Sequence, residues 1–181
     1  MEHKSKMPPK ATGRPDNFQT LNPEVAVQSI LDGIPKDKII WCPASGEGRM
    51  VDYMRDQGYK VVSSDILSGW DFLDTLSGLP DFDYIVENPP YATKDKWLKR
   101  CYDLGKPFAL MLPATAIGEQ GRVKMYKKYG TDLFLPDARI EFITPNGTEG
   151  GGWFYAAWFC KGIAFPKINQ IGSIYGAGTL I

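Results

Sequence analysis

Short β-rich runs alternate with amphipathic segments along most of this 181-residue chain, and this alternation limits the fold more than any other feature of the sequence. The β-rich runs predict strands at residues 38–41, 59–63, 82–86 and 108–112. Apolar side chains at helical spacing predict helices at residues 22–33, 49–58, 97–101 and 119–129. Strands that alternate with helices predict an α/β domain with an open, mostly parallel sheet, whose ligands lie outside the carboxyl ends of the strands.

The ends of the predicted domain are marked by a change in composition. Asn22 is expected to cap the first helix, with Pro23 at its first position. Residues 1–16 are polar and basic and are expected to form a disordered tail, whereas 17–165 form the domain and 166–181 a C-terminal extension. Three closing strands are predicted at residues 131–135, 139–143 and 153–160.

Composition excludes several classes of protein. No apolar run approaches the roughly 20 residues of a membrane-spanning helix, so we expect no membrane partner. Cys42, Cys101 and Cys160 have neither zinc-site nor disulfide spacing, and His3 is the single histidine, so we expect no metal site and a reducing, cytoplasmic location. The net charge is zero, so nucleic-acid binding requires local clusters of Lys and Arg.

The segment Pro43-Ala44-Ser45-Gly46-Glu47-Gly48, here called the glycine turn, joins a predicted strand to a predicted helix. Glycines at such a junction let the main chain approach a ligand, and the helix start is expected to offer free N–H groups. The alternative is an ordinary tight turn. The segment matches neither the dinucleotide fingerprint nor the P-loop, so NAD and ATP are poor candidates.

Two acidic residues follow the next predicted strand. Asp65 stands at its carboxyl end, where an acid can accept hydrogen bonds from ribose hydroxyls, although a helix cap would look the same. Asp71 and Phe72 follow, and an acceptor beside an aromatic face can hold an adenine ring.

The tetrad Asn88-Pro89-Pro90-Tyr91 is the most specific motif, since four given residues occur by chance in such a chain about once in a thousand. An exocyclic aromatic amine is a poor nucleophile because its lone pair is delocalised, so a catalyst must hold its N–H groups with fixed acceptors. Asn88 and the Pro89 carbonyl supply two acceptors, and Pro90 fixes the direction of the second. Tyr91 offers a face for an extruded base. A rigid turn after a strand is the alternative.

This order of motifs resembles the class I S-adenosylmethionine-dependent methyltransferases, most closely the phage-type DNA N6-adenine methyltransferases. Residues 18–160 take part. Phe18, Thr20 and Pro23 resemble the family's segment at the methionine end of the cofactor. The glycine turn, with Pro43, Ala44, Ser45, Gly46 and Gly48, resembles the cofactor loop, Asp65 the ribose ligand, and Asp71-Phe72-Leu73 the adenine-side motif. Residues 139–142, 145–147 and 150–152 resemble the closing strands and loop.

The resemblance implies a Rossmann-like class I fold with an antiparallel closing strand. It implies S-adenosylmethionine as cofactor, S-adenosylhomocysteine as product, and methylation of adenine N6 in DNA, in a bacterial or phage-infected cell. Asn88 also takes part in cofactor binding in this scheme. The family often has an acid where this chain has Cys42.

Two basic clusters are candidates for nucleic-acid binding, although solvated helix faces are the simpler explanation for such runs. Residues 146–154 form a candidate flap over the substrate. The clusters consist of Lys94, Lys96, Lys99 and Arg100, and of Arg122, Lys124, Lys127 and Lys128.

Three other functions remain open at this point. One is N-methylation of an RNA base or a protein glutamine, and another is methylation of cytosine N4, whose enzymes more often begin the tetrad with Ser. The third is a nucleic-acid-binding or scaffold protein that kept the fold and lost the cofactor, which Cys42 would allow.

Overall fold

A computed structural model describes residues 18–74, 78–136, 138–150, 154–164 and 170–173. Within these residues no helix combines the length and the apolar character needed to cross a membrane. The helices are α1 (Pro23–Leu31), α2 (Arg49–Asp56), α3 (Lys94–Leu104) and α4 (Gln120–Tyr129), with 3-10 turns η1 (Ile66–Ser68), η2 (Tyr91–Thr93) and η3 (Ala114–Gly118). The strands are β1 (Gln19–Thr20), β2 (Ile39–Cys42), β3 (Lys60–Ser63), β4 (Tyr84–Glu87), β5 (Phe108–Pro113), β6 (Asp132–Phe134), β7 (Phe142–Ile143), β8 (Glu149–Gly150), β9 (Ala156–Lys161) and β10 (Gln170–Ser173).

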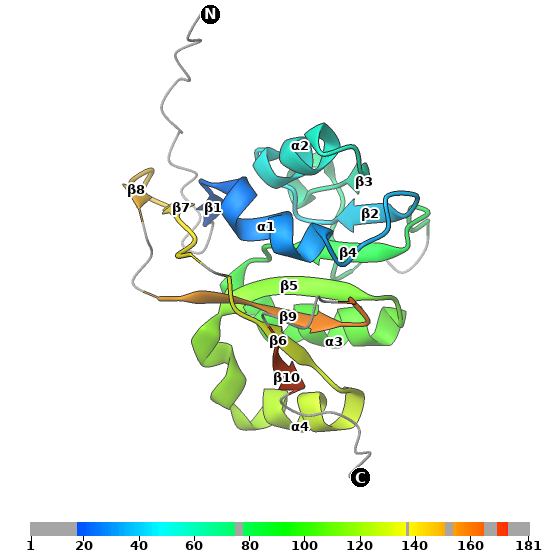
Figure 1. The fold of residues 1–181 in the computed structure, drawn as a ribbon, viewed down its shortest axis with the longest axis vertical. Helices are drawn as coiled ribbons and strands as arrows, with labels where there is room; N and C mark the ends of the chain where they lie inside the picture. Colours follow the sequence, from blue (N-terminus) through cyan, green and yellow to red (C-terminus); the bar gives the residue numbers. More distant parts are fainter. Residues whose placement is uncertain (1–17, 75–77, 137, 151–153, 165–169, 174–181) are drawn as a thin grey trace, which may run out of the picture.

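The main sheet has the order β10-β6-β9-β5-β4-β2-β3 (Figure 1). Strands β3, β2, β4 and β5 are mutually parallel, whereas β9 is antiparallel to both β5 and β6. The prediction of a Rossmann-like, mostly parallel sheet closed by an antiparallel strand is therefore confirmed.

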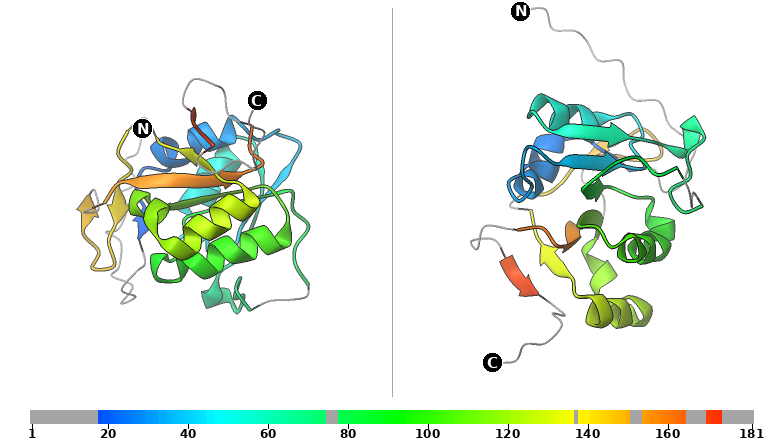
Figure 2. Two further views of the ribbon diagram at one scale, coloured as in Figure 1. Left: turned by 90° about the horizontal axis from the view of Figure 1, so that it is seen from below. Right: turned by 90° about the vertical axis from the view of Figure 1, so that its right-hand side faces the viewer.

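Helices cover both faces of this sheet, and two neighbouring residues of β9 show which helix covers which face (Figure 2). Successive side chains of a strand point to opposite faces. The Trp158 indole N–H donates to the Ala26 carbonyl of α1 at 2.7 Å, whereas the Phe159 ring stacks on Tyr126 of α4. Buried on both faces, β5 is apolar throughout, as expected of a central strand.

A second, small sheet stands beside the carboxyl ends of the parallel strands and has the order β1-β7-β8. The prediction that residues 139–143 form a closing strand of the main sheet is wrong. Phe142 and Ile143 pair instead with Thr20 and Gln19, and residues 139–141 form no strand. Asn22 begins α1 as expected, but its side chain accepts the Glu141 N–H at 3.0 Å and does not cap the helix.

The structure describes part of the predicted C-terminal extension and none of the predicted N-terminal tail. Strand β10 pairs with β6 inside the region expected to be a C-terminal extension. The expected tail at 1–16 lies outside the described residues. Residues 151–153 also lie outside them, so the flap at 146–154 is described only in part.

Candidate active site

One cavity of about 360 Å³ opens at the carboxyl ends of β2, β3 and β4, where the sequence predicts a ligand site. All the predicted cofactor residues except Gly48 line it, and so do Asn88, Pro89 and Pro90 of the tetrad. Arg49, Trp70, Glu87 and Trp97 also line it, and sequence reasoning missed them. The cavity walls are formed by Phe18, Gln19, Thr20, Cys42, Pro43, Ala44, Ser45, Gly46, Arg49, Met50, Val51, Asp65, Ile66, Leu67, Trp70, Asp71, Phe72, Leu73, Glu87, Asn88, Pro89, Pro90, Thr93 and Trp97.

The glycine turn is held by acceptors that take every N–H group of residues 44–48, whereas the free N–H groups expected at the helix start belong to α2, which begins at Arg49. Gly46 and Gly48 have φ of 52° and 82°, the left-handed conformation that glycine adopts most easily. A turn whose N–H groups are all used offers no anion cradle. The acceptors are Glu87 Oε2 for Ala44 (2.7 Å), the Ser64 carbonyl for Ser45 (3.1 Å), Asp65 Oδ2 for Gly46 (3.0 Å), Gln19 Oε1 for Glu47 (3.3 Å) and the Ser45 carbonyl for Gly48 (2.8 Å).

The charged side chains that line the cavity are mostly acidic. Among the described residues, the acids Asp65, Asp71 and Glu87 line the cavity together with one base, Arg49. Asp65 caps η1 by accepting the Leu67 N–H at 2.9 Å, so the cap interpretation is correct, and its position in the wall also leaves it available to a ligand hydroxyl. An acidic cavity beside a turn whose own N–H groups are used suits a cationic ligand better than a phosphate.

Glu87 is the functional candidate that sequence reasoning missed. It is the last residue of β4 and 4% exposed, and its two carboxylate oxygens accept the N–H groups of Ala44 (2.7 Å) and Asn88 (2.8 Å). Burial raises the pKa of this carboxyl to about 7, the two N–H groups act in the opposite direction, and the charge of Asp65 raises it further. A Glu that ends an otherwise apolar strand beside the tetrad was the available signal.

Asn88 has a defined orientation. Its Nδ2 donates to the Phe18 carbonyl at 2.6 Å and to Thr20 Oγ1 at 3.5 Å. These bonds fix which side of the amide is oxygen, a choice that geometry alone leaves ambiguous. Asn88 Oδ1 is buried and has no hydrogen-bond partner among the described residues. A buried acceptor without a donor costs about 1–3 kcal/mol, which a donating ligand would recover.

Tyr91 does not present the open face expected for an extruded base. Its ring is 8% exposed, lies nearly parallel to Phe18 at 5.6 Å, and contacts the edge of Phe154 at 5.3 Å. Phe18 is half-buried and lines the cavity, whereas Tyr91 is absent from the lining residues. The aromatic surface at the cavity therefore belongs to Phe18, with Tyr91 packed against it.

Phe72 reaches the cavity as predicted, but its ring is also part of the core. It stacks on Trp97 at 4.2 Å and meets Trp41 edge-on at 5.4 Å. The face against Trp97 is therefore closed to an adenine ring, and Phe72 contributes mainly an apolar wall.

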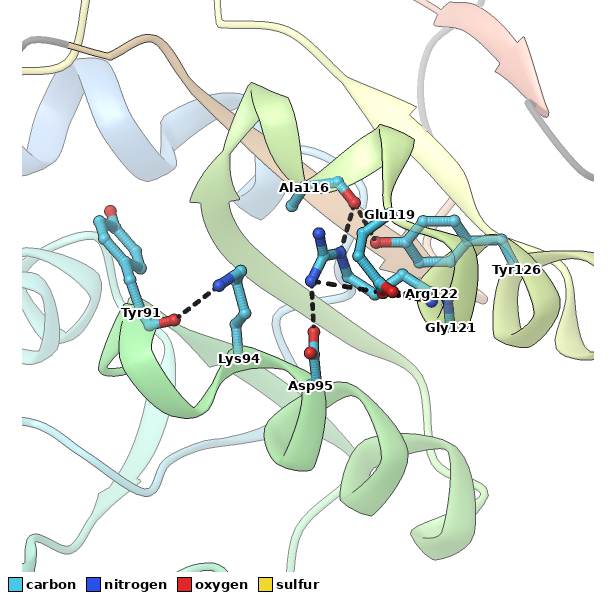
Figure 3. Close-up of polar contacts among 8 residues, drawn as sticks. All are labelled: Tyr91, Lys94, Asp95, Ala116, Glu119, Gly121, Arg122 and Tyr126. Carbon is cyan, nitrogen blue, oxygen red and sulfur yellow. Dashed lines mark hydrogen bonds and ion pairs between the residues drawn. The ribbon is translucent and has the colours of Figure 1, made fainter.

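The two predicted basic clusters differ in their position. Lys94 and Lys96 begin α3, directly after the tetrad, and Lys94 Nζ donates to the Tyr91 carbonyl at 3.1 Å (Figure 3). Lys96 is exposed. Lys99 is exposed and pairs with Asp103 at 2.6 Å.

Arg122 is not a surface cation. Its side chain is 7% exposed and forms a clamp, in which Nη1 contacts Asp95 at 2.6 Å and Nε donates to the Ala116 carbonyl at 2.6 Å (Figure 3). Glu119 adds a longer ion pair at 3.8 Å. The clamp joins α3, η3 and α4, so this guanidinium is committed to the fold.

Lys124, Lys127 and Lys128 are exposed on α4, but the end of this helix lies away from the cavity. Lys161 Nζ donates to the Tyr129 carbonyl at 2.6 Å, and Lys161 pairs with Phe108, the first residue of β5. Residues 127–129 are therefore near the amino ends of the parallel strands, whereas the cavity is at their carboxyl ends.

Comparison with solved structures finds similarity at the level of the fold. The 23S rRNA methyltransferase ErmE is 15% identical, with a TM-score of 0.52 over 83% of this chain and 71% of ErmE. A candidate RNA methyltransferase from Pyrococcus horikoshii is 10% identical, with a TM-score of 0.52 over 87% of this chain and 91% of that chain. A dimethyladenosine transferase from Plasmodium falciparum is 12% identical, with a TM-score of 0.51, and the 80% of this chain that aligns spans 61% of it.

No family model matches the sequence, and no curated protein matches it either. At such low identities, structural similarity establishes the fold alone. The chain has the Rossmann-like fold that these methyltransferases share.

Proposed function

We propose that this protein is an S-adenosylmethionine-dependent methyltransferase whose acceptor is an exocyclic amino nitrogen. The observation that carries the proposal is the buried Oδ1 of Asn88, which has no partner among the described residues and belongs to a residue of the cavity wall. An amide oxygen held in this way is a fixed acceptor for one N–H of an amine.

The cavity suits the proposed cofactor in size and charge. About 360 Å³ is within the usual range of small-molecule sites, and the acidic lining with no free N–H from residue 44 to residue 48 favours a sulfonium compound over a phosphate ester. Asp65 would hold the ribose hydroxyls, the glycine turn would support the methionine portion, and Asp71 would accept from the adenine amino group. When bound, the cofactor supplies an electrophilic methyl group on a positively charged sulfur.

The residues of the protein contribute by positioning. Asn88 Oδ1 accepts one N–H of the target amine, and the Pro89 carbonyl accepts the second, so that the nitrogen lone pair points at the methyl carbon. Phe18 offers the ring against which a planar base can stack. Transfer of the methyl group would release S-adenosylhomocysteine and leave the target nitrogen cationic, and this nitrogen would then lose its proton to solvent.

The acceptor that we infer is adenine N6 in DNA. The complete Asn-Pro-Pro-Tyr tetrad and the resemblance to phage-type enzymes support it, and the exposed Lys96 beside the tetrad supports a polyanionic substrate. Adenine in RNA is the second candidate, since the structural neighbours include an rRNA methyltransferase and a dimethyladenosine transferase.

Kinetics of Asn88→Ala test the role of the orphaned oxygen. We expect turnover to fall by about 10²–10³ while the Kd for cofactor changes little, because one acceptor of the reacting amine is lost. Thr20→Val is the control, since it removes a contact that anchors the Asn88 amide but keeps Oδ1, and it should lose far less turnover. Wild-type turnover in Asn88→Ala would exclude the proposed role.

A further inference from the structure

Glu87 is a buried carboxyl in the wall of a ligand cavity. It is held between the glycine turn and the tetrad by its bonds to the Ala44 and Asn88 N–H groups. The ion pairs among the described residues do not include it. A buried carboxylate without a counter-ion is costly, and the cost falls when a cation enters the same cavity.

The ionisation of Glu87 is balanced near neutral pH, because burial raises its pKa to about 7. Burial, reinforced by the Glu87 charge, raises the pKa of Cys42 and Cys101, so neither thiol ionises in this range. Within the cavity wall and the packed elements, the groups that face Glu87 or share its cavity are Cys42 on β2, Cys101 on α3, Arg49 on α2, and Asp65 and Asp71 in the segments after β3.

We propose, resting on the proposed function, that Glu87 makes the cavity select the cationic cofactor over its neutral demethylated product. Its carboxyl ionises as S-adenosylmethionine binds and releases the proton to solvent. It takes a proton back from solvent when only S-adenosylhomocysteine remains. Glu87 thereby acts as a specificity-determining residue that favours release of product after each transfer.

The sign of the pH dependence follows from the raised pKa. A bound cation stabilises the ionised carboxylate and lowers its pKa, so the complex holds fewer protons than the free protein. Affinity for S-adenosylmethionine therefore rises with pH until the free carboxyl is ionised, by about tenfold between about pH 6 and about pH 8. Affinity for the neutral product stays nearly constant over the same range.

The test is calorimetric titration of the full chain with S-adenosylmethionine and with S-adenosylhomocysteine, in buffers of different ionisation enthalpy. Wild-type protein should release up to one proton per S-adenosylmethionine bound near neutral pH and none with the product. Glu87→Gln should abolish the pH dependence and reduce the preference for the cofactor about tenfold. Glu24→Gln, an exposed acid of α1 outside the cavity wall, should keep both properties.

The outcomes separate this inference from the proposed function. If neither nucleoside binds, the proposed function fails and the inference falls with it. If both bind but Glu87→Gln weakens them equally, Glu87 is only structural and the inference alone is overturned. If Glu87→Gln does not fold, ¹³C-labelled glutamate in wild-type protein decides the matter. One carboxyl titrating near neutral pH must shift to lower pH with S-adenosylmethionine and not with the product, and absence of that shift overturns the inference.

Discussion

Gly46 shows how a single residue prepares the cavity. Its φ of 52° is left-handed, and a Cβ added there would lie 2.5 Å from the Gln19 side chain. We expect Gly46→Ala to destabilise the fold by about 1–2 kcal/mol and to weaken cofactor binding about tenfold, since the turn must move. Gly58→Ala is the matched control. Its φ is 83°, and no described atom lies within 4 Å of the added Cβ. Thermal unfolding should shift for both variants, but cofactor affinity measured by calorimetry should fall only for Gly46→Ala, and equal affinity losses would contradict this account.

At the residue level, the sequence predicts what depends on local context. Gly46 was predicted because it lies in a turn directly after a strand, and Asn88 because it begins a specific motif directly after another strand. The burial of Glu87 was not, because its partner Ala44 meets it only after β2 and β4 pair side by side. The covering of Tyr91 by Phe18 depends on a contact between residues far apart in sequence, which no local pattern reveals.

Among the elements, α4 is attached to the rest of the domain by the Arg122 clamp. We expect Arg122→Ala to lower the free energy of unfolding by about 2 kcal/mol, because the Ala116 carbonyl and Asp95 lose a charged donor. Lys124→Ala, on the exposed face of the same helix, should stay within about 0.5 kcal/mol of wild type. Urea unfolding measures both, and an Arg122→Ala variant as stable as wild type would show that the clamp contributes nothing.

For the same helix, the sequence predicts the bounds but not which of its cations is buried. The limits of α4 were predicted closely, yet Arg122 was counted with the surface cations. Its spacing of four residues from Tyr126 placed both on the inner face, and that was the available signal. Residues 139–143 were assigned to the wrong sheet because their partners, Gln19 and Thr20, lie more than a hundred residues away. Strand propensity does not identify a partner.

Across the whole molecule, exposed lysines lie near both ends of the parallel strands, with Lys96 near the carboxyl ends and Lys127 and Lys128 near the amino ends. The cavity lies at the carboxyl ends. Since the net charge is zero, we expect nucleic acid to bind only where cations adjoin the cavity. Lys96→Ala should raise the KM for nucleic acid and reduce the salt slope of binding by about 0.9, the value for one phosphate contact. Lys127→Ala and Lys128→Ala should leave both unchanged. Steady-state kinetics over a salt series decide, and a larger effect at residues 127–128 would move the substrate track to the amino ends.

The fold, the acidic cavity and the orphaned oxygen of Asn88 together support the proposal of methyl transfer to an adenine amino group. The most direct measurement is transfer of a labelled methyl group from S-adenosylmethionine to unmethylated DNA, RNA and a cell protein extract in parallel, followed by nucleoside analysis. The account predicts label as N6-methyladenine in DNA, and label in RNA alone would support the second candidate. Transfer to none of these acceptors, together with no cofactor binding by calorimetry, would contradict the account and leave a scaffold with a methyltransferase fold.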